Sequence, residues 1–277
     1  MDLMTSSVQS NPIREYWEWM NINENRKHVS TKIYKTYKEL IRIIEDDNSE
    51  WEYDSEKAGH AITFIEKYCK HSKGKMGGKP FILELWQKAK VAATFGIVHK
   101  IDGLRKYQRV VLIVARKNGK STLSAAEGLY LFIADGEPGA EIYSVATKKD
   151  QAKIIWLEAK RMVKKSPALN KRIRPLVAEM VSDWNDGVYK PVGRDSDTLD
   201  GLNVHGATMD EIHAWTDKNL YDVIADGTSS RDQPLILVTT TSGTVRENVY
   251  DEIYQEAEMT INGYDDPDGY KDERSLF

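Results

Sequence analysis

The stretch "QRVVLIVARKNGKSTLSAAEGLYLF", at residues 108–132, limits the possible folds of this chain more than any other part of the sequence. An apolar, β-branched run precedes a basic turn, and good helix formers follow the turn. Strand, turn and helix in this order are the setting of a phosphate-binding loop, in which backbone N–H groups and the helix dipole face phosphates. Val114 stands where such loops usually begin with glycine, so an ordinary strand–turn–helix remains the alternative interpretation.

Within this turn, the residue types match the parts of a site for ATP and Mg²⁺. Gly119 lets the backbone approach the phosphates, Lys120 would bridge the β- and γ-phosphates, and Ser121 would coordinate Mg²⁺. The residues expected to contact the nucleotide are Ala115, Arg116, Lys117, Asn118, Gly119, Lys120, Ser121 and Thr122.

A second apolar run, in "VHGATMDEIHAW" at residues 204–215, ends in two acids. Asp210, at the carboxyl end of the expected strand, could hold Mg²⁺ through its water shell. Glu211 could polarise a water molecule for in-line attack on the γ-phosphate. The alternative is a surface strand that happens to end in two acids. That interpretation is less favoured because the acidic pair follows the loop along the chain and ends an apolar strand, as a metal-binding acid beside a phosphate loop does.

Two further sequence features would be ordinary alone, but they support a nucleotide site when they occur together with the loop and the acidic pair. The strand "PLILVTTTSG" (234–243) ends in hydroxyls, and Thr241 or a neighbour among residues 239–242 could lie between the two earlier strands and bind the γ-phosphate or the water. A threonine-rich strand is the alternative there. Gln87 lies on an expected helix before the loop. Its amide N–H can donate to N7 of adenine and its amide oxygen can accept from N6. The alternative is an ordinary glutamine on the surface of a helix.

We expect three regions along the chain. Residues 1–75 form a helical N-terminal extension, and residues 76–250 form an α/β domain, because short apolar runs typical of buried parallel strands alternate with helical patterns. Residues 251–277 form an acidic C-terminal segment that we expect to begin a lid or linker, and its tail "NGYDDPDGYKDERSLF" (262–277) contains Gly and Pro, so we expect that tail to be loose. The expected helices span 12–20, 31–46, 55–71 and 246–260, and the expected strands span 109–115, 141–146, 204–209 and 235–240.

Composition limits the partners. The formal net charge is −4, so a nucleic-acid surface must be a local patch. Residues 148–174 are rich in Lys and Arg. These side chains could contact the phosphates of DNA, or they could belong to an ordinary surface helix with solvated lysines. Four lysines share one face of the helix expected there: Lys149, Lys153, Lys160 and Lys164. A single cysteine, Cys69, excludes a disulfide framework, and no apolar run approaches the ~20 residues of a membrane span.

Two metal-binding patterns are rejected. "DSDTLDG" (195–201) resembles a calcium loop, but Leu199 occupies a ligand position and Gly206 stands where the bidentate acid belongs. We expect a turn or a DNA-facing loop there. His213 has no second histidine at helical spacing, so we do not assign it to zinc.

The series "ELWQ", "ARKNGKST", "TMDEIHAW" and "VTTTSG", over about residues 79–250, resembles the large terminase subunit of tailed double-stranded-DNA bacteriophages. That subunit is the ATPase of the genome-packaging motor, and its loop lacks the usual first glycine but has an early basic residue, here Arg116. The resemblance implies an α/β P-loop NTPase fold of the ASCE/RecA-like type, with a mainly parallel central sheet flanked by helices. It also implies that ATP is hydrolysed with Mg²⁺ to move double-stranded DNA into a procapsid.

Site roles follow from the same resemblance. Lys120 and Ser121 would bind phosphate and Mg²⁺, Asp210 would hold the metal and Glu211 would be the catalytic carboxylate. Residues 239–242 would form the coupling motif, and Gln87 would read adenine. From the sequence itself, two arginines are candidates to act on the γ-phosphate: Arg116 in cis, and Arg231, or another arginine, from a neighbouring subunit. A surface arginine at a helix end is the alternative for Arg231.

The implied partners are double-stranded DNA, the portal protein and procapsid, the small terminase subunit and further copies of the chain in a ring, in the host cytoplasm without a membrane. We do not expect nuclease activity, because the chain stops at Phe277 and leaves no room for the nuclease domain that usually follows the ATPase. Two alternatives remain open: a helicase-like ATPase of the superfamily 2 type, and a non-catalytic DNA-binding assembly module.

Overall fold

The computed structural model describes residues 10–194, 201–216, 218–242 and 248–277. Its contacts divide the chain into two units. The first contains Met1–Ile62 and Leu83–Arg105, and the second contains Thr63–Ile82 and Lys106–Phe277. This division differs from the expected boundaries, because residues 83–105 group with the N-terminal helices and residues 251–277 group with the unit that holds the phosphate loop.

The first unit consists of helices and one small antiparallel pair of strands. Helix α1 begins at Asn11, whose side chain accepts hydrogen bonds from the first turn, and Pro12 suits the first helical position. Helix α1 packs on α3 and α5, and β1 pairs with β2. The elements are α1 (Pro12–Met20), α2 (Asn23–Arg26), α3 (Thr31–Glu45), β1 (Trp51–Tyr53), the start of α4 (Ser55–Tyr68), α5 (Leu85–Gly96) and β2 (Ile97–His99).

The second unit is built on an eight-stranded sheet with the strand order β10-β3-β9-β8-β4-β7-β6-β5. Pairing is parallel from β10 to β7, whereas the β7–β6 and β6–β5 pairs are antiparallel. The mainly parallel sheet predicted from the sequence is therefore confirmed. The strands are β3 (Arg109–Ile113), β4 (Glu141–Ala146), β5 (Arg174–Pro175), β6 (Met180–Ser182), β7 (Gly187–Gly193), β8 (Val204–Asp210), β9 (Leu235–Thr240) and β10 (Ser275–Leu276).

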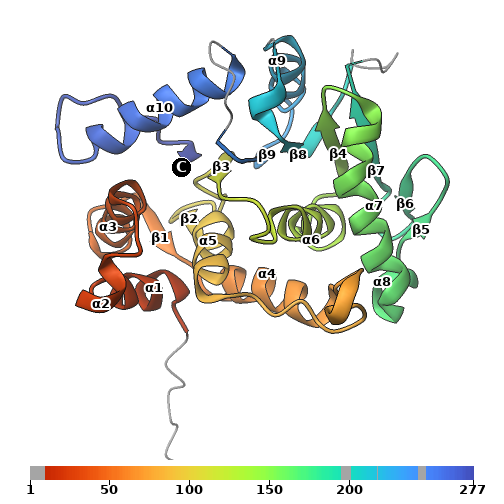
Figure 1. Ribbon diagram of the computed structural model, residues 1–277, viewed down its shortest axis with the longest axis horizontal. Helices are drawn as coiled ribbons and strands as arrows, with labels where there is room; N and C mark the ends of the chain where they lie inside the picture. The colour runs from red at the N-terminus through yellow and green to blue at the C-terminus, as the bar shows by residue number, and fades with distance from the viewer. Residues whose placement is uncertain (1–9, 195–200, 217, 243–247) are drawn as a thin grey trace, which may run out of the picture. The chain divides into compact units, whose positions relative to one another are not determined.

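Helices cover both faces of this sheet (Figure 1). Helices α6 (Lys120–Ile133) and α7 (Lys149–Lys165) pack on one face, where Gly206 of β8 permits close contact with α6. A Cβ at Gly206 would lie 2.9 Å from the terminal methyl groups of Leu131 and Ile142, so these side chains would have to shift to admit a larger residue. Helices α9 (Asn219–Asp226) and α10 (Val249–Gly263) cover the other face, around a core that includes Val111, Met209 and Val238. The short elements are η1 (Gly74–Met76), α8 (Pro167–Asn170) and η2 (Ile212–Ala214).

The tail after α10 is anchored to the sheet through its last residues, so the expectation that this tail is loose is wrong. Strand β10 pairs in parallel with β3. Arg109 of β3 binds Ser275 at 2.7 Å, Asp272 at 2.7 Å and Glu256 at 2.8 Å. The acidic residues of the tail thus compensate a half-buried arginine, and β10 covers an edge that β3 would otherwise expose. Among the described residues, no helix is long and apolar enough to cross a membrane.

Candidate active site

The loop that follows β3 has the backbone shape of a phosphate-binding turn. The N–H of Val114 donates to Thr240 O at 3.1 Å, so the loop starts beside the end of β9. Gly119 has φ 76°, in the left-handed region that glycine adopts without steric cost, and α6 begins at the next residue. The Asn118 side chain donates to Ala115 O at 3.0 Å and closes the turn. Residues 115–119 are exposed, whereas Lys120 is buried.

Three charged side chains meet at the carboxyl edge of the sheet. The Nζ of Lys120 lies 2.8 Å from Asp210 Oδ1 and also pairs with Glu211 Oε1. Strand β9 lies between β3 and β8, so the hydroxyl-rich end of β9 separates the loop from the acidic pair. Thr239 Oγ1 donates to Asp210 Oδ1 at 3.2 Å. Residues that are far apart in the sequence therefore form one polar cluster, as expected from parallel strands that end at the same edge.

Glu211 is held in an uncommon backbone conformation. Its φ is 52°, in the left-handed region, which costs free energy for a residue with a Cβ. Its N–H donates to Thr239 O at 2.9 Å and to Asp210 Oδ1 at 3.0 Å, and these bonds fix the turn into η2. Strained residues of this kind are concentrated at functional sites.

His213 belongs to this cluster, although the sequence was interpreted only as lacking a zinc partner for it. Its Nδ1 lies 2.9 Å from Thr240 Oγ1 and 3.0 Å from Glu211 Oε2. Asn248, which caps α10, donates to His213 O at 3.0 Å. The sequence feature that could have pointed to His213 is its position two residues after the candidate base Glu211, just beyond the end of the same strand.

The other residues expected at the site differ in their burial and in their hydrogen-bond partners. Thr241 is buried and its carbonyl accepts from Thr240 Oγ1 at 2.9 Å, whereas Arg116 is exposed in the loop. Gln87 belongs to the first unit and is buried, with Oε1 accepting the N–H of Glu84 at 2.9 Å in the capping box of α5. Of the calcium-like segment 195–201, residues 195–200 lie outside the described residues.

Arg231 differs most from its expected role. It lies just before β9, so it is at the amino edge of the parallel sheet, opposite the loop. Its guanidinium binds Glu137 at 2.6 Å and donates to Gly139 O at 2.8 Å and Asn203 O at 3.3 Å. With its side chain only 10% exposed, Arg231 joins loops of its own chain, and we do not include it in the proposed catalytic set.

Arg231→Ala is therefore expected to lower stability. Loss of the guanidinium leaves Glu137 and the carbonyl groups of Pro138, Gly139 and Asn203 without this partner, at a cost of about 2–3 kcal/mol. Urea unfolding of this variant and of Arg172→Ala, an exposed control, measures the difference. Unchanged stability, with lost hydrolysis that returns when Arg231→Ala and Glu211→Gln chains are mixed, would instead support action in trans.

A hollow opens beside the start of α6. It has a volume of about 360 Å³ and is lined by Ser121, Thr122, Leu157, Arg161 and the segment 71–73, among others. Glu158 at its wall accepts a hydrogen bond from Ser72 and lies 3.6 Å from Arg161. The volume is within the range of small-molecule pockets. The phosphate loop thus has an adjoining space inside the second unit.

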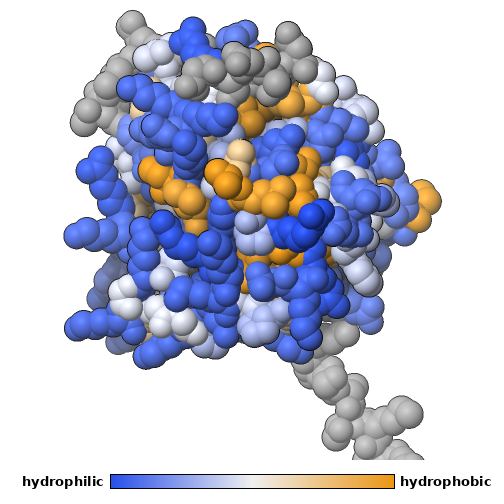
Figure 2. All heavy atoms as spheres, turned by 90° about the vertical axis from the view of Figure 1, so that its right-hand side faces the viewer, coloured by the Kyte–Doolittle hydropathy of each residue, from blue (hydrophilic) through white to orange (hydrophobic). Residues whose placement is uncertain are grey.

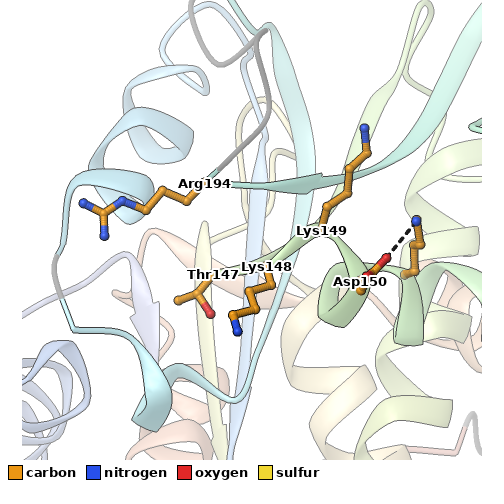
Figure 3. A pocket seen from close by; sticks show the side chains of 6 residues that line it. Thr147, Lys148, Lys149, Asp150 and Arg194 are labelled. Atoms are coloured by element: carbon orange, nitrogen blue, oxygen red, sulfur yellow. Dashed lines mark hydrogen bonds and ion pairs between the residues drawn. The ribbon is translucent and has the colours of Figure 1, made fainter.

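A second, more open hollow of about 670 Å³ lies at the carboxyl ends of β4 and β7 and is mostly basic. Figure 3 shows that its side chains spread apart and do not converge on one point. Asp150, its one acid, is paired with Lys153 at 2.8 Å. The lining residues are Thr147, Lys148, Lys149, Asp150, Lys153 and Arg194.

The lysine face expected on α7 is present only in part. Ala152, Ile155, Ala159 and Met162 are buried, as the pattern predicted. Lys160, however, donates to Leu176 O and lies 4.5 Å from the ring centroid of Trp156, so its ammonium is held by the protein. Figure 2 shows this side of the molecule, where hydrophilic side chains surround a hydrophobic area. The exposed apolar residues here include Ile154 on α7, Val177 in the β5–β6 turn and Trp184 in the β6–β7 turn.

The fold and the site together define the class of protein. A buried lysine after a strand–loop turn, an acidic pair two strands away and a strand with a hydroxyl-rich end between them are the arrangement of P-loop NTPases of the ASCE type. The family model described as "Terminase large subunit, ATPase domain" matches residues 85–259, and this chain belongs to that family.

Two comparisons give the extent of the similarity. The large terminase subunit of Enterobacteria phage HK97 is 28% identical over 185 residues, which are 65% of this chain and 36% of that protein. The crystal structure of the HK97 large terminase matches with a TM-score of 0.63 and 23% identity, over 73% of this chain and 41% of that one. The chain therefore spans well under half the length of these relatives, and the second match concerns the fold alone.

Proposed function

We propose that this chain hydrolyses ATP to drive double-stranded DNA into a procapsid, as the motor domain of a phage packaging enzyme. The observation that carries the proposal is the cluster of Lys120, Asp210 and Glu211 at the carboxyl edge of the sheet, in a chain of the terminase ATPase family. Backbone N–H groups of the loop and the N-terminus of α6 would bind the phosphates.

The ion pairs of Lys120 suggest how the site changes when ATP binds. Lys120 now neutralises two carboxylates, and the triphosphate would compete for the same ammonium group. When Lys120 turns to the β- and γ-phosphates, Glu211 is released to accept a proton from the attacking water. Arg116, exposed in the loop, is the residue that we propose to act on the γ-phosphate in cis.

The donor atoms near the loop fit Mg²⁺. Asp210 and Ser121 offer a carboxylate and a hydroxyl, and oxygen donors of this kind suit a hard cation. The described residues contain no cluster of three or more potential metal-binding side chains, which agrees with an ion held by one carboxylate and by substrate phosphates. The ion would offset negative charge, because the three-residue cluster is already net negative.

DNA is the polymer that we propose to contact the basic hollow at β4 and β7. Three lysines and an arginine line it against one acid, although the whole chain has a net charge of −4. The spread of these side chains suits a row of phosphates better than a single anion (Figure 3). The proposed ring, the portal protein and the small terminase subunit follow from the family and have no assigned surface on this chain.

Lys148→Ala combined with Lys149→Ala is expected to weaken DNA binding without sequence preference. Each lost phosphate contact lowers the slope of log K against log salt by about 0.9, so the slope should fall by up to about 2. Fluorescence anisotropy with a labelled duplex over a salt series measures it. Lys164→Ala with Lys165→Ala removes the same charge from the other end of α7, and an equal effect there would argue against the hollow.

Hydrolysis assays distinguish the proposed packaging motor from the helicase-like ATPase and from the non-catalytic module. ATPase activity that rises with duplex DNA supports a motor and opposes a non-catalytic assembly module. Strand displacement in the same reaction would favour the helicase alternative, whereas duplex movement without strand separation supports packaging. Absence of any DNA-stimulated ATP hydrolysis would contradict the proposal.

A further inference from the structure

One ring nitrogen in the candidate site lies close to two oxygen atoms. The Nδ1 of His213 lies 2.9 Å from Thr240 Oγ1 and 3.0 Å from Glu211 Oε2. Thr240 Oγ1 also accepts the backbone N–H of His213 at 3.3 Å. Within the described part of the chain, Glu211 Oε2 is buried and makes no hydrogen bond of good geometry.

The donors and acceptors identify the protonated nitrogen of the ring. The Thr240 hydroxyl donates its only proton to Thr241 O at 2.9 Å, so its oxygen must accept from His213 Nδ1. A carboxylate oxygen can only accept, and Glu211 Oε2 lies 3.0 Å from the same nitrogen, at ion-pair distance though not in hydrogen-bond geometry. His213 therefore has a hydrogen on Nδ1, between the hydroxyl at the end of β9 and the carboxylate that we propose as the base.

We propose that His213 is a positioning residue that holds the Glu211 carboxylate during ATP hydrolysis. The inference rests on the proposed function, in which Lys120 leaves Glu211 for the phosphates. Glu211 Oε1 then loses its ammonium partner, and the His213 N–H beside Oε2 is the group that keeps the carboxylate in orientation.

His213 is itself fixed by three elements. Its backbone follows β8, its ring contacts the end of β9, and its carbonyl accepts from the Asn248 side chain. Asn248 also accepts the N–H of Tyr250 at 3.0 Å as the N-cap of α10. Movement of α10 or β9 would therefore change the position of the base, which gives the hydrolysis step a mechanical connection to both elements.

The test compares two amide replacements. Asparagine places an N–H near the position of Nδ1, whereas glutamine places it near Nε2, which contacts neither acceptor. His213→Asn should keep most of kcat, and His213→Gln should lose about 10–100-fold with little change in KM. If glutamine prevents folding, as shown by the thermal midpoint, His213→Ala gives the same comparison because it removes the donor and adds no bulk.

A double-mutant cycle shows whether His213 acts through Glu211. In the Glu211→Gln background, His213→Gln should produce no further loss of the residual rate. An equal loss in both backgrounds, equal loss with Asn and Gln, or wild-type kcat with Gln would overturn the positioning role. The proposed function fails separately, if the wild type does not hydrolyse ATP or if Glu211→Gln hydrolyses it at the wild-type rate.

Discussion

Lys120→Ala is expected to abolish ATP hydrolysis. The substitution removes the buried ammonium group that we propose to bridge the β- and γ-phosphates, and no neighbouring cation of α6 can replace it at the start of the helix. Nucleotide affinity should fall as well, because the phosphates lose a charge-assisted contact.

The same substitution also leaves two carboxylates without their shared cation. Asp210 is buried, but the Glu211 side chain is 34% exposed, so the cost should be about 1–3 kcal/mol, less than for a fully buried pair. Thermal unfolding must therefore accompany the ATPase assay, with Lys271→Ala as an exposed control. Wild-type turnover by folded Lys120→Ala protein would show that the site is assigned wrongly.

The acidic pair should divide into two roles. Glu211→Gln keeps the shape of the side chain but cannot accept a proton, so it should bind ATP and lose about 10²-fold or more in kcat. Asp210→Asn keeps a carbonyl oxygen for the bonds from Glu211 N and Thr239, so the strand end should remain folded. It should instead weaken Mg²⁺-dependent nucleotide binding.

Binding and turnover, measured separately over a Mg²⁺ titration, distinguish these roles. Glu211→Gln should follow the wild-type titration, and Asp210→Asn should need more Mg²⁺ for the same occupancy. Identical behaviour of the two variants in both measurements would contradict separate roles.

The centre of the sheet could be predicted because its strands are buried on both faces and so are predominantly apolar. β4 and β9 coincide with the predicted ranges, and β8 extends one residue further, to Asp210. β7 escaped prediction because Pro191 lacks an N–H and argues against an internal strand, yet β7 pairs with both β4 and β6.

The proximity of the loop and the acidic pair could be predicted, because parallel strands end at the same edge of a sheet. The partners of individual side chains could not be predicted in this way. The sequence placed Arg231 before β9 without showing that Glu137 and nearby carbonyl groups bind it. It also did not show that Gln87 uses its amide oxygen within α5, or that Arg109 holds the acidic tail. Such contacts depend on tertiary neighbours that local patterns do not encode.

The most direct test of the central claim is retention of nucleotide by the Glu211→Gln chain. The protein is mixed with ATP and Mg²⁺, passed rapidly through a desalting column, and the bound nucleotide is identified and quantified. A site formed by Lys120, Asp210 and Glu211 predicts intact ATP at equimolar occupancy, lost when Mg²⁺ is chelated or when Lys120→Ala is added. No bound nucleotide, or bound ADP formed at the wild-type rate, would contradict the assignment of this cluster as the ATP-hydrolysing site.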